Sequence, residues 1–190
     1  GATECLPVAT IGSDELKQTR SATERGCGIC IGWPIEPKQV RIIPIDDKPI
    51  PDWVEASCLP AGAIGEIVVS GPIVTRKYYN RPEATALAKM IDSQTGTIWH
   101  RIGDLGYVDT LGRLWFCGRK SQRVVTPGGT LFTIPCEAIF NAHPGVERSA
   151  LVAAGIDGRV IPIICIERQA TDSRPWHEVD AELRAKAQCH

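Results

Sequence analysis

Short apolar runs separated by glycine and proline dominate the middle of the chain. The segments 39–45 (QVRIIPI) and 65–72 (GEIVVSGP) each have the length of a single strand and end at turn residues. Such strands, repeated at near-regular intervals across 26–119, predict a small barrel or sandwich. Within 99–119 (WHRIGDLGYVDTLGRLWFCGR), the pattern predicts a strand that ends at Gly103 and then a hairpin.

Toward the carboxyl terminus the pattern alternates between helix and strand. A helix is predicted at 135–142, which begins with proline and carries an acid near its start. The apolar segments 146–154 and 160–167 predict two strands that can pair through a connection at 155–158, and apolar residues four apart predict a last helix at 178–187. The polar segment 5–25 predicts a loop with at most one helical turn. The predicted fold class is therefore α+β.

Composition restricts the classes of binding partner expected for the chain, and it says less about the fold. The 190 residues are 43% hydrophobic, which is enough for a core, and carry 21 basic and 22 acidic side chains without a long run of either sign. This balance argues against a nucleic-acid or anionic-membrane surface. No apolar run approaches the ~20 residues of a membrane span, and the amino terminus lacks the layout of a signal peptide. We therefore expect a cytoplasmic protein without a transmembrane segment.

The chain contains eight cysteines, of which most lie singly among apolar residues and are expected to act as small hydrophobes. Cys27 and Cys30 form a CxxC, which is compatible with a redox pair or with half of a zinc site. No second CxxC completes a metal shell, and both residues fall in a predicted strand, so a structural role is favoured. The eight positions are Cys5, Cys27, Cys30, Cys58, Cys117, Cys136, Cys165 and Cys189.

The candidate chemistry lies in the 99–119 segment. Asp104 directly follows a glycine, and an ionised carboxylate at such a turn can accept both protons of two adjacent hydroxyls, as in a ribose. Arg119 follows a second glycine, from which a guanidinium can reach a phosphate or the same sugar. The residue types therefore predict a nucleotide site at this hairpin.

The pattern GDLGY.D..G.L.F.GR of this hairpin resembles the ribose-binding segment of the adenylate-forming superfamily, which comprises acyl-CoA synthetases, peptide-synthetase adenylation domains and luciferases. Residues 1–4 (GATE) resemble its GxTE motif, and GEI.VSG followed by YYNRPEAT at 78–85 matches its order of motifs. The resemblance implies that Asp104 holds the ribose hydroxyls of ATP or AMP and that Arg119 supports the ribose or phosphate.

The GxTE resemblance also implies catalytic roles at the amino terminus of the chain. Thr3 would contact the α-phosphate, and Glu4 would bind Mg²⁺, for which a carboxylate oxygen is a suitable ligand. Three other residues of the matched motifs, Glu66, Tyr78 and Arg81, are expected to be barrel and turn residues without a catalytic role.

The resemblance further implies the domain organisation. Residues 1–119 correspond to the carboxyl-terminal part of a large adenylation domain, with its barrel-like subdomain at 26–119, and 120–190 correspond to a hinge and part of a mobile α+β lid. The remainder of the adenylation domain is then an implied partner. Because the phosphate-gripping Ser/Thr/Gly-rich loop and the adenylation lysine of the family have no counterpart, the chain alone is expected to have little activity.

Departures from the family pattern indicate a particular branch. The usual hinge aspartate falls at Ser121, and the lid loop at 128–137 is longer and lacks an arginine. Together with the segments WHR.GD.GY, FCGRK and IP.EA.FN.HP.V, these departures resemble the sequences of the β-lactone synthetases of bacterial long-chain olefin biosynthesis. The resemblance implies activation of a 2-alkyl-3-hydroxy fatty acid as acyl-AMP and closure by its own 3-hydroxyl to a β-lactone with release of AMP. It also implies other olefin-pathway enzymes as partners.

Two alternatives stay open. One is a fatty-acyl-CoA ligase or fatty-acyl-AMP ligase, which would need a thiol acceptor. The other, of a different class, is a non-catalytic nucleotide- or metal-binding module that uses the CxxC.

Overall fold

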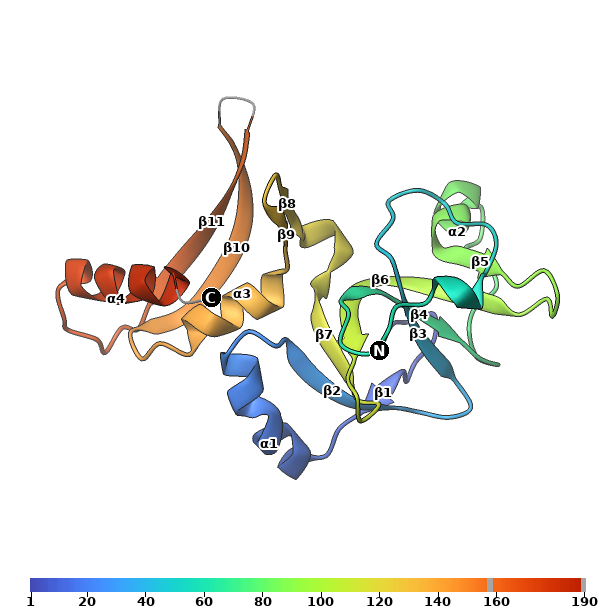
Figure 1. Cartoon of the computed structure of the whole chain (residues 1–190), viewed down its shortest axis with the longest axis horizontal. Helices are drawn as coiled ribbons and strands as arrows, with labels where there is room; N and C mark the ends of the chain where they lie inside the picture. The colour runs from blue at the N-terminus through green and yellow to red at the C-terminus, as the bar shows by residue number, and fades with distance from the viewer. Residues whose placement is uncertain (157–158, 189–190) are drawn as a thin grey trace.

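The computed structural model describes residues 1–156 and 159–188, and most of the first part of the chain forms one curled antiparallel sheet (Figure 1). Its seven strands do not close on themselves, because β1 and β3 remain at the two edges, so the sheet is a half-barrel. This confirms the predicted barrel-like subdomain. In spatial order the strands are β1 (Ala9–Thr10), β2 (Ile29–Pro34), β7 (Leu114–Arg119), β6 (Ile98–Val108), β4 (Gly65–Ser70) and β3 (Gln39–Ile43), and β5 (Lys89–Ile91) also pairs with β6.

Strand β4 lies at the centre of the core, and all six of its residues are buried. Its side chains alternate between two apolar clusters, with Ile67 and Val69 on one face and Val68 on the other. The second cluster contains the stacked rings of Trp53 and Trp99, whose centroids are 3.9 Å apart. Burial of both faces explains why this strand is a continuous apolar run rather than an alternating one.

Strand β6 continues through Gly103, so the prediction that it ends there was wrong. Val68 of β4 pairs with Arg101 and Glu66 pairs with Leu105, so residues 102–104 oppose a single residue of β4 and form a bulge. Gly103 has a φ of +77°, which favours glycine. The strand continues because β4 pairs with it on both sides of the bulge, and β7 pairs with it from Asp104 onward. The predicted hairpin is confirmed.

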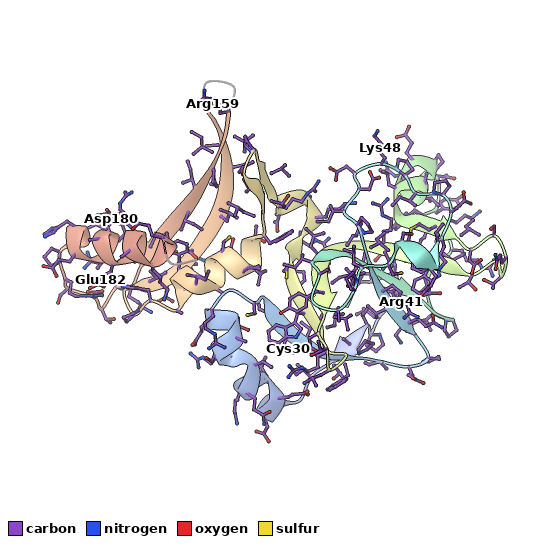
Figure 2. The ribbon with its side chains drawn as sticks, viewed as in Figure 1. Cys30, Arg41, Lys48, Arg159, Asp180 and Glu182 are labelled. Atoms are coloured by element: carbon purple, nitrogen blue, oxygen red, sulfur yellow. The ribbon has the colours of Figure 1, made fainter. Side chains whose placement is uncertain are left out.

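The carboxyl-terminal part is built on a long hairpin of β10 (Val146–Ile156) and β11 (Arg159–Arg168), which confirms the predicted strand pair. Part of their predicted connection, 157–158, lies outside the described residues. Helices α3 (Thr133–Asn141) and α4 (Trp176–Gln188) pack against the hairpin through Val146, Val179 and Leu183. A small hairpin of β8 (Val124–Thr126) and β9 (Gly129–Leu131) precedes α3. Asp180 and Glu182 lie on α4 (Figure 2).

The segment 5–25, predicted to be a loop, contains the helix α1 (Ser13–Glu24). Thr19 is its only buried residue, so the helix carries no apolar periodicity that the sequence could reveal. Helix α2 (Pro82–Ala88) begins at a proline, whereas α3 begins at Thr133 rather than at the predicted Pro135. Short 3₁₀ turns occupy Glu55–Ser57 and Lys120–Gln122. None of the described helices has the length and apolar character that a membrane span requires.

Helix α3 approaches β7 at Gly118, where the two parts of the chain meet. A Cβ atom at Gly118 would lie 2.2 Å from Oγ1 of Thr133, and the φ of Gly118 is +119°. Only glycine satisfies both conditions. The start of α3 therefore lies directly on the backbone of β7.

A buried network of charges joins the sheet to the segment after β7. Arg101 donates to Oε2 of Glu66 through Nε and Nη2 (3.1 and 2.7 Å), and Lys120 donates to Oε1 (3.0 Å). The side chains of Glu66 and Arg101 are each 1% exposed. Arg101 also donates to the carbonyl oxygens of Asp46, Lys48 and Leu87, the first two on the loop between β3 and β4, where Figure 2 labels Lys48.

We expect Glu66→Ala to lower the free energy of unfolding by about 3 kcal/mol, because it leaves the buried Arg101 and the partly buried Lys120 without their carboxylate. Urea denaturation followed by tryptophan fluorescence measures the change. The control is Glu147→Ala, since Glu147 is exposed on β10; it should change stability by less than about 0.5 kcal/mol. Equal effects of the two substitutions would contradict a structural role for the network.

Candidate active site

Asp104 and Arg119 form a pair at the β6–β7 hairpin. The two residues are register partners, and Nη1 of Arg119 donates to Oδ1 of Asp104 at 2.6 Å. The Asp104 side chain is 16% exposed and that of Arg119 is 55% exposed. Because Oδ2 of Asp104 and the other guanidinium N–H groups remain able to bind, the pair can accept hydroxyl protons and donate to an anion. The structure thus brings these two predicted site residues together, and their role stays a prediction.

A hollow of about 680 Å³ borders Arg119. Its walls come from the end of β7, the 3₁₀ turn after it, the start of α3 and the middle of β10. Arg123 and Glu137 contribute the other charged side chains of its lining. The open space therefore extends from Arg119 toward the carboxyl-terminal part of the chain.

Glu4 lies in a second polar cluster. The hydroxyl of Tyr78 donates to Oε1 of Glu4 at 2.8 Å, and Nε2 of His100 lies 3.8 Å from Oε2. The hydrogen bond from Tyr78 is the main cause that lowers the pKa of Glu4 below its ordinary value, so the carboxylate is ionised at neutral pH. Thr3 is exposed beside it. Strand β6 connects the two clusters, because it carries both His100 and Asp104.

The surroundings of Glu4 include residues to which the sequence assigned no functional role. Lys89 is 6% exposed, and its Nζ donates to Oγ1 of Thr75 at 3.1 Å. His100 is 1% exposed, and its Nδ1 lies 3.1 Å from the carbonyl oxygen of Ala88. Burial lowers the pKa of both Lys89 and His100. The available signal was a basic residue in a short apolar segment: Lys89 at the start of KMI, and His100 next to Arg101 within IWHRI.

Glu4 fits a magnesium ion only as a single-carboxylate ligand. Mg²⁺ commonly takes one or two carboxylates and completes its shell with phosphate oxygens and waters. Among the described residues no three His, Cys, Asp or Glu side chains form a group that could hold a metal ion. Glu4 is therefore compatible with a cation that is bound together with a nucleotide, rather than with a site in which the protein alone supplies every ligand.

The CxxC does not form a joint site in the described part of the chain. Cys30 is 1% exposed within β2, next to β7 (Figure 2), whereas Cys27 is exposed and precedes β2, contrary to the prediction that both lie in the strand. Burial raises the pKa of Cys30, as expected for an inert thiol. Every described cysteine is free, and Cys189 lies outside the described residues.

The chain is similar to several proteins of known name, although it matches no protein-family model. It is 50% identical to an olefin beta-lactone synthetase from Stenotrophomonas maltophilia, over 98% of the chain and 34% of that protein. A protein of the same name from Xanthomonas campestris pv. campestris is 48% identical over 100% of the chain and 35% of its own length. A 2-succinylbenzoate–CoA ligase from Bacillus cytotoxicus is 32% identical, over 87% of the chain and 34% of that protein.

Solved structures share the fold. The amide bond synthetase McbA from Marinactinospora thermotolerans superposes with a TM-score of 0.73 at 22% identity, over 97% of the chain and 34% of McbA. ATP-bound MatB from Rhodopseudomonas palustris gives a TM-score of 0.63 at 25% identity, over 80% of the chain and 29% of MatB.

The chain spans about one third of the length of the curated relatives that it matches. Both the sequence identities and the shared fold agree with the resemblance drawn from the GDLGY hairpin and the GATE segment. The chain therefore belongs to the adenylate-forming superfamily, within which its sequence is similar to the olefin beta-lactone synthetases.

Proposed function

We propose that the chain is part of an ATP-dependent enzyme that activates a carboxylate as an acyl-adenylate, and that this enzyme is a β-lactone synthetase. The observation that carries the proposal is the half-buried Asp104 paired with Arg119, in a chain 50% identical to a named olefin beta-lactone synthetase. The substrate would be a long-chain 2-alkyl-3-hydroxy fatty acid. The remainder of the adenylation domain would supply the acyl pocket and the other phosphate contacts.

In the first step, the substrate carboxylate attacks the α-phosphorus of ATP and pyrophosphate leaves. Asp104 would accept hydrogen bonds from the ribose hydroxyls, while Arg119 would donate to the ribose or phosphate. Thr3 would donate a hydrogen bond from its hydroxyl to an α-phosphate oxygen. Glu4 would hold Mg²⁺, which neutralises phosphate charge when bound. These residues orient the nucleotide and stabilise charge that develops in the transition state.

In the second step, the 3-hydroxyl oxygen of the same acyl group attacks the acyl carbonyl and its proton passes to solvent. The bond between the acyl carbon and the phosphate oxygen breaks, so that a four-membered lactone forms and AMP leaves with the bonding electrons. An intramolecular nucleophile has a high effective concentration and needs no separate acceptor site. The departures at Ser121 and in the 128–137 loop support this proposal, because a thioester-forming partner reaction is not required. A cytoplasmic location and contact with other olefin-pathway enzymes belong to the same proposal.

An acyl-CoA ligase is the second candidate. The observation in its favour is the 32% identity, over 87% of the chain, to a protein named 2-succinylbenzoate–CoA ligase. Such an enzyme would share the first step and would transfer the acyl group to a thiol in the second. Delivery of acyl-AMP to a carrier protein is a variant of this candidate.

A product assay separates the candidates. The complete enzyme is incubated with ATP, Mg²⁺ and a 2-alkyl-3-hydroxy fatty acid, with and without CoA, and the products are read by mass spectrometry. We expect a β-lactone and AMP at equal rates in both reactions, because the hydroxyl is already tethered to the acyl group. An acyl-CoA product, or an acyl-adenylate that accumulates until CoA is added, would establish the ligase instead.

Asp104→Ala in the complete enzyme should weaken AMP binding by ~2 kcal/mol, about 30-fold, because charge-assisted hydrogen bonds to the ribose are lost. Isothermal titration calorimetry measures this change. Asp14→Ala serves as the control, since the Asp14 side chain is 87% exposed on α1. An AMP affinity that both substitutions leave unchanged would refute the ribose assignment.

A further inference from the structure

Tyr78 contacts only one of the two Glu4 carboxylate oxygens. Its hydroxyl donates to Oε1 at 2.8 Å, whereas Oε2 has only Nε2 of His100 within ion-pair distance, at 3.8 Å, among the described residues. A separation of 3.8 Å is too long for a hydrogen bond. The carboxylate is therefore fixed through one oxygen and free at the other.

The phenol of Tyr78 is itself held from several sides. The Tyr78 backbone N–H donates to Oγ1 of Thr85 at 3.0 Å, which ties the residue to α2. Nζ of Lys89 lies 5.8 Å from the centroid of the Tyr78 ring, and the His100 ring meets it edge-on at 6.5 Å. Tyr78 is part-buried, so its position is set by packing rather than by solvent.

The backbone of Glu4 is fixed by the same segment of chain. The N–H of Thr75 donates to the carbonyl oxygen of Glu4 at 3.0 Å, and Oγ1 of Thr75 in turn accepts from Lys89. Residues from 75 to 89 therefore hold both the main chain and one side-chain oxygen of Glu4. Because the main chain and one carboxylate oxygen of Glu4 are both restrained, Oε2 can point in few directions.

We propose that Tyr78 is a positioning residue, which holds Glu4 through Oε1 so that Oε2 alone is presented to a divalent cation. The inference rests on the proposed function, in which Glu4 binds Mg²⁺. It deepens that function by specifying a one-oxygen contact and by assigning a role to Tyr78, which the sequence indicated as a turn residue only. Partners that orient a metal-binding carboxylate commonly change metal affinity when they are removed.

The test uses the complete enzyme with ATP and Mn²⁺ as a paramagnetic substitute for Mg²⁺. Tyr78→Phe removes one hydroxyl and keeps the ring. We expect the Mn²⁺ dissociation constant of the ATP complex, read from the free-Mn²⁺ signal in electron paramagnetic resonance, to rise about 10-fold. ATP affinity without a metal should not change. The neighbouring Tyr79→Phe is a matched control, since Tyr79 is 86% exposed, and it should leave both constants unchanged.

Glu4→Gln distinguishes failure of this inference from failure of the Glu4 assignment. If Glu4→Gln weakens Mn²⁺ binding and Tyr78→Phe does not, the positioning role is overturned while Glu4 remains a cation ligand. If neither weakens it, both the Glu4 assignment and the inference are wrong, and the product assay still reports on adenylation. A loss of metal-free ATP binding in Tyr78→Phe, equal to the loss with metal, would indicate a structural role only and would also overturn the inference.

A second variant covers the case in which Tyr78→Phe does not fold. Thr85→Val removes the hydroxyl oxygen that accepts the Tyr78 backbone N–H and leaves the phenol in place. It should raise the Mn²⁺ dissociation constant about 3-fold, because the phenol is held less firmly. An unchanged constant in folded Thr85→Val would count against the inference.

Discussion

The structure depends on one carboxylate, Glu66, that is buried at the centre of the sheet and shared by two cations. Desolvation of three charges is costly, so the arrangement is stable only if every donor finds an acceptor. Arg101 and Lys120 leave an excess positive charge, which main-chain carbonyl oxygens from the β3–β4 loop and the end of α2 balance. The requirement adds polar anchors to the apolar packing by which Trp53 already holds the β3–β4 loop on the sheet. A loop rich in proline and polar residues is thereby ordered by the strand core beneath it.

The sequence predicted features whose determinants are local. The continuous apolar run of β4 and the hairpin that carries Asp104 and Arg119 depend on residues close together in the chain, and so the pair could be anticipated as one site. The cluster around Glu4 could not, because Tyr78 comes from the loop before α2, Lys89 from β5 and His100 from β6, and these segments meet only in the folded protein. Gly103 was wrongly predicted to end its strand for a related reason: β4 pairs with β6 on both sides of the bulge, and this pairing overrides the local tendency of a glycine with positive φ to end a strand. Helix α1 was missed because an exposed polar helix has no apolar period.

The fold by itself does not select the reaction. An amide bond synthetase at 22% identity and a TM-score of 0.73, and an ATP-bound enzyme at 25% identity, share this architecture. The two superpositions cover 97% and 80% of the chain. The choice of acceptor must then depend on individual residues, or on other parts of the complete proteins, rather than on the fold. The 50% and 48% identities to proteins named olefin beta-lactone synthetase are therefore more informative about the acceptor than the shared fold is.

The order of residues at the end of β7 has a mechanical consequence. Arg119, which pairs with Asp104, is followed immediately by Lys120, whose ammonium is bound to the buried Glu66. Any rotation of the chain beyond this point must begin after a residue that is anchored in the sheet. The distance between Arg119 and Asp104 then stays the same whichever way the carboxyl-terminal part is turned. The Asp104–Arg119 pair is therefore a fixed part of the sheet, whichever orientation the carboxyl-terminal part adopts.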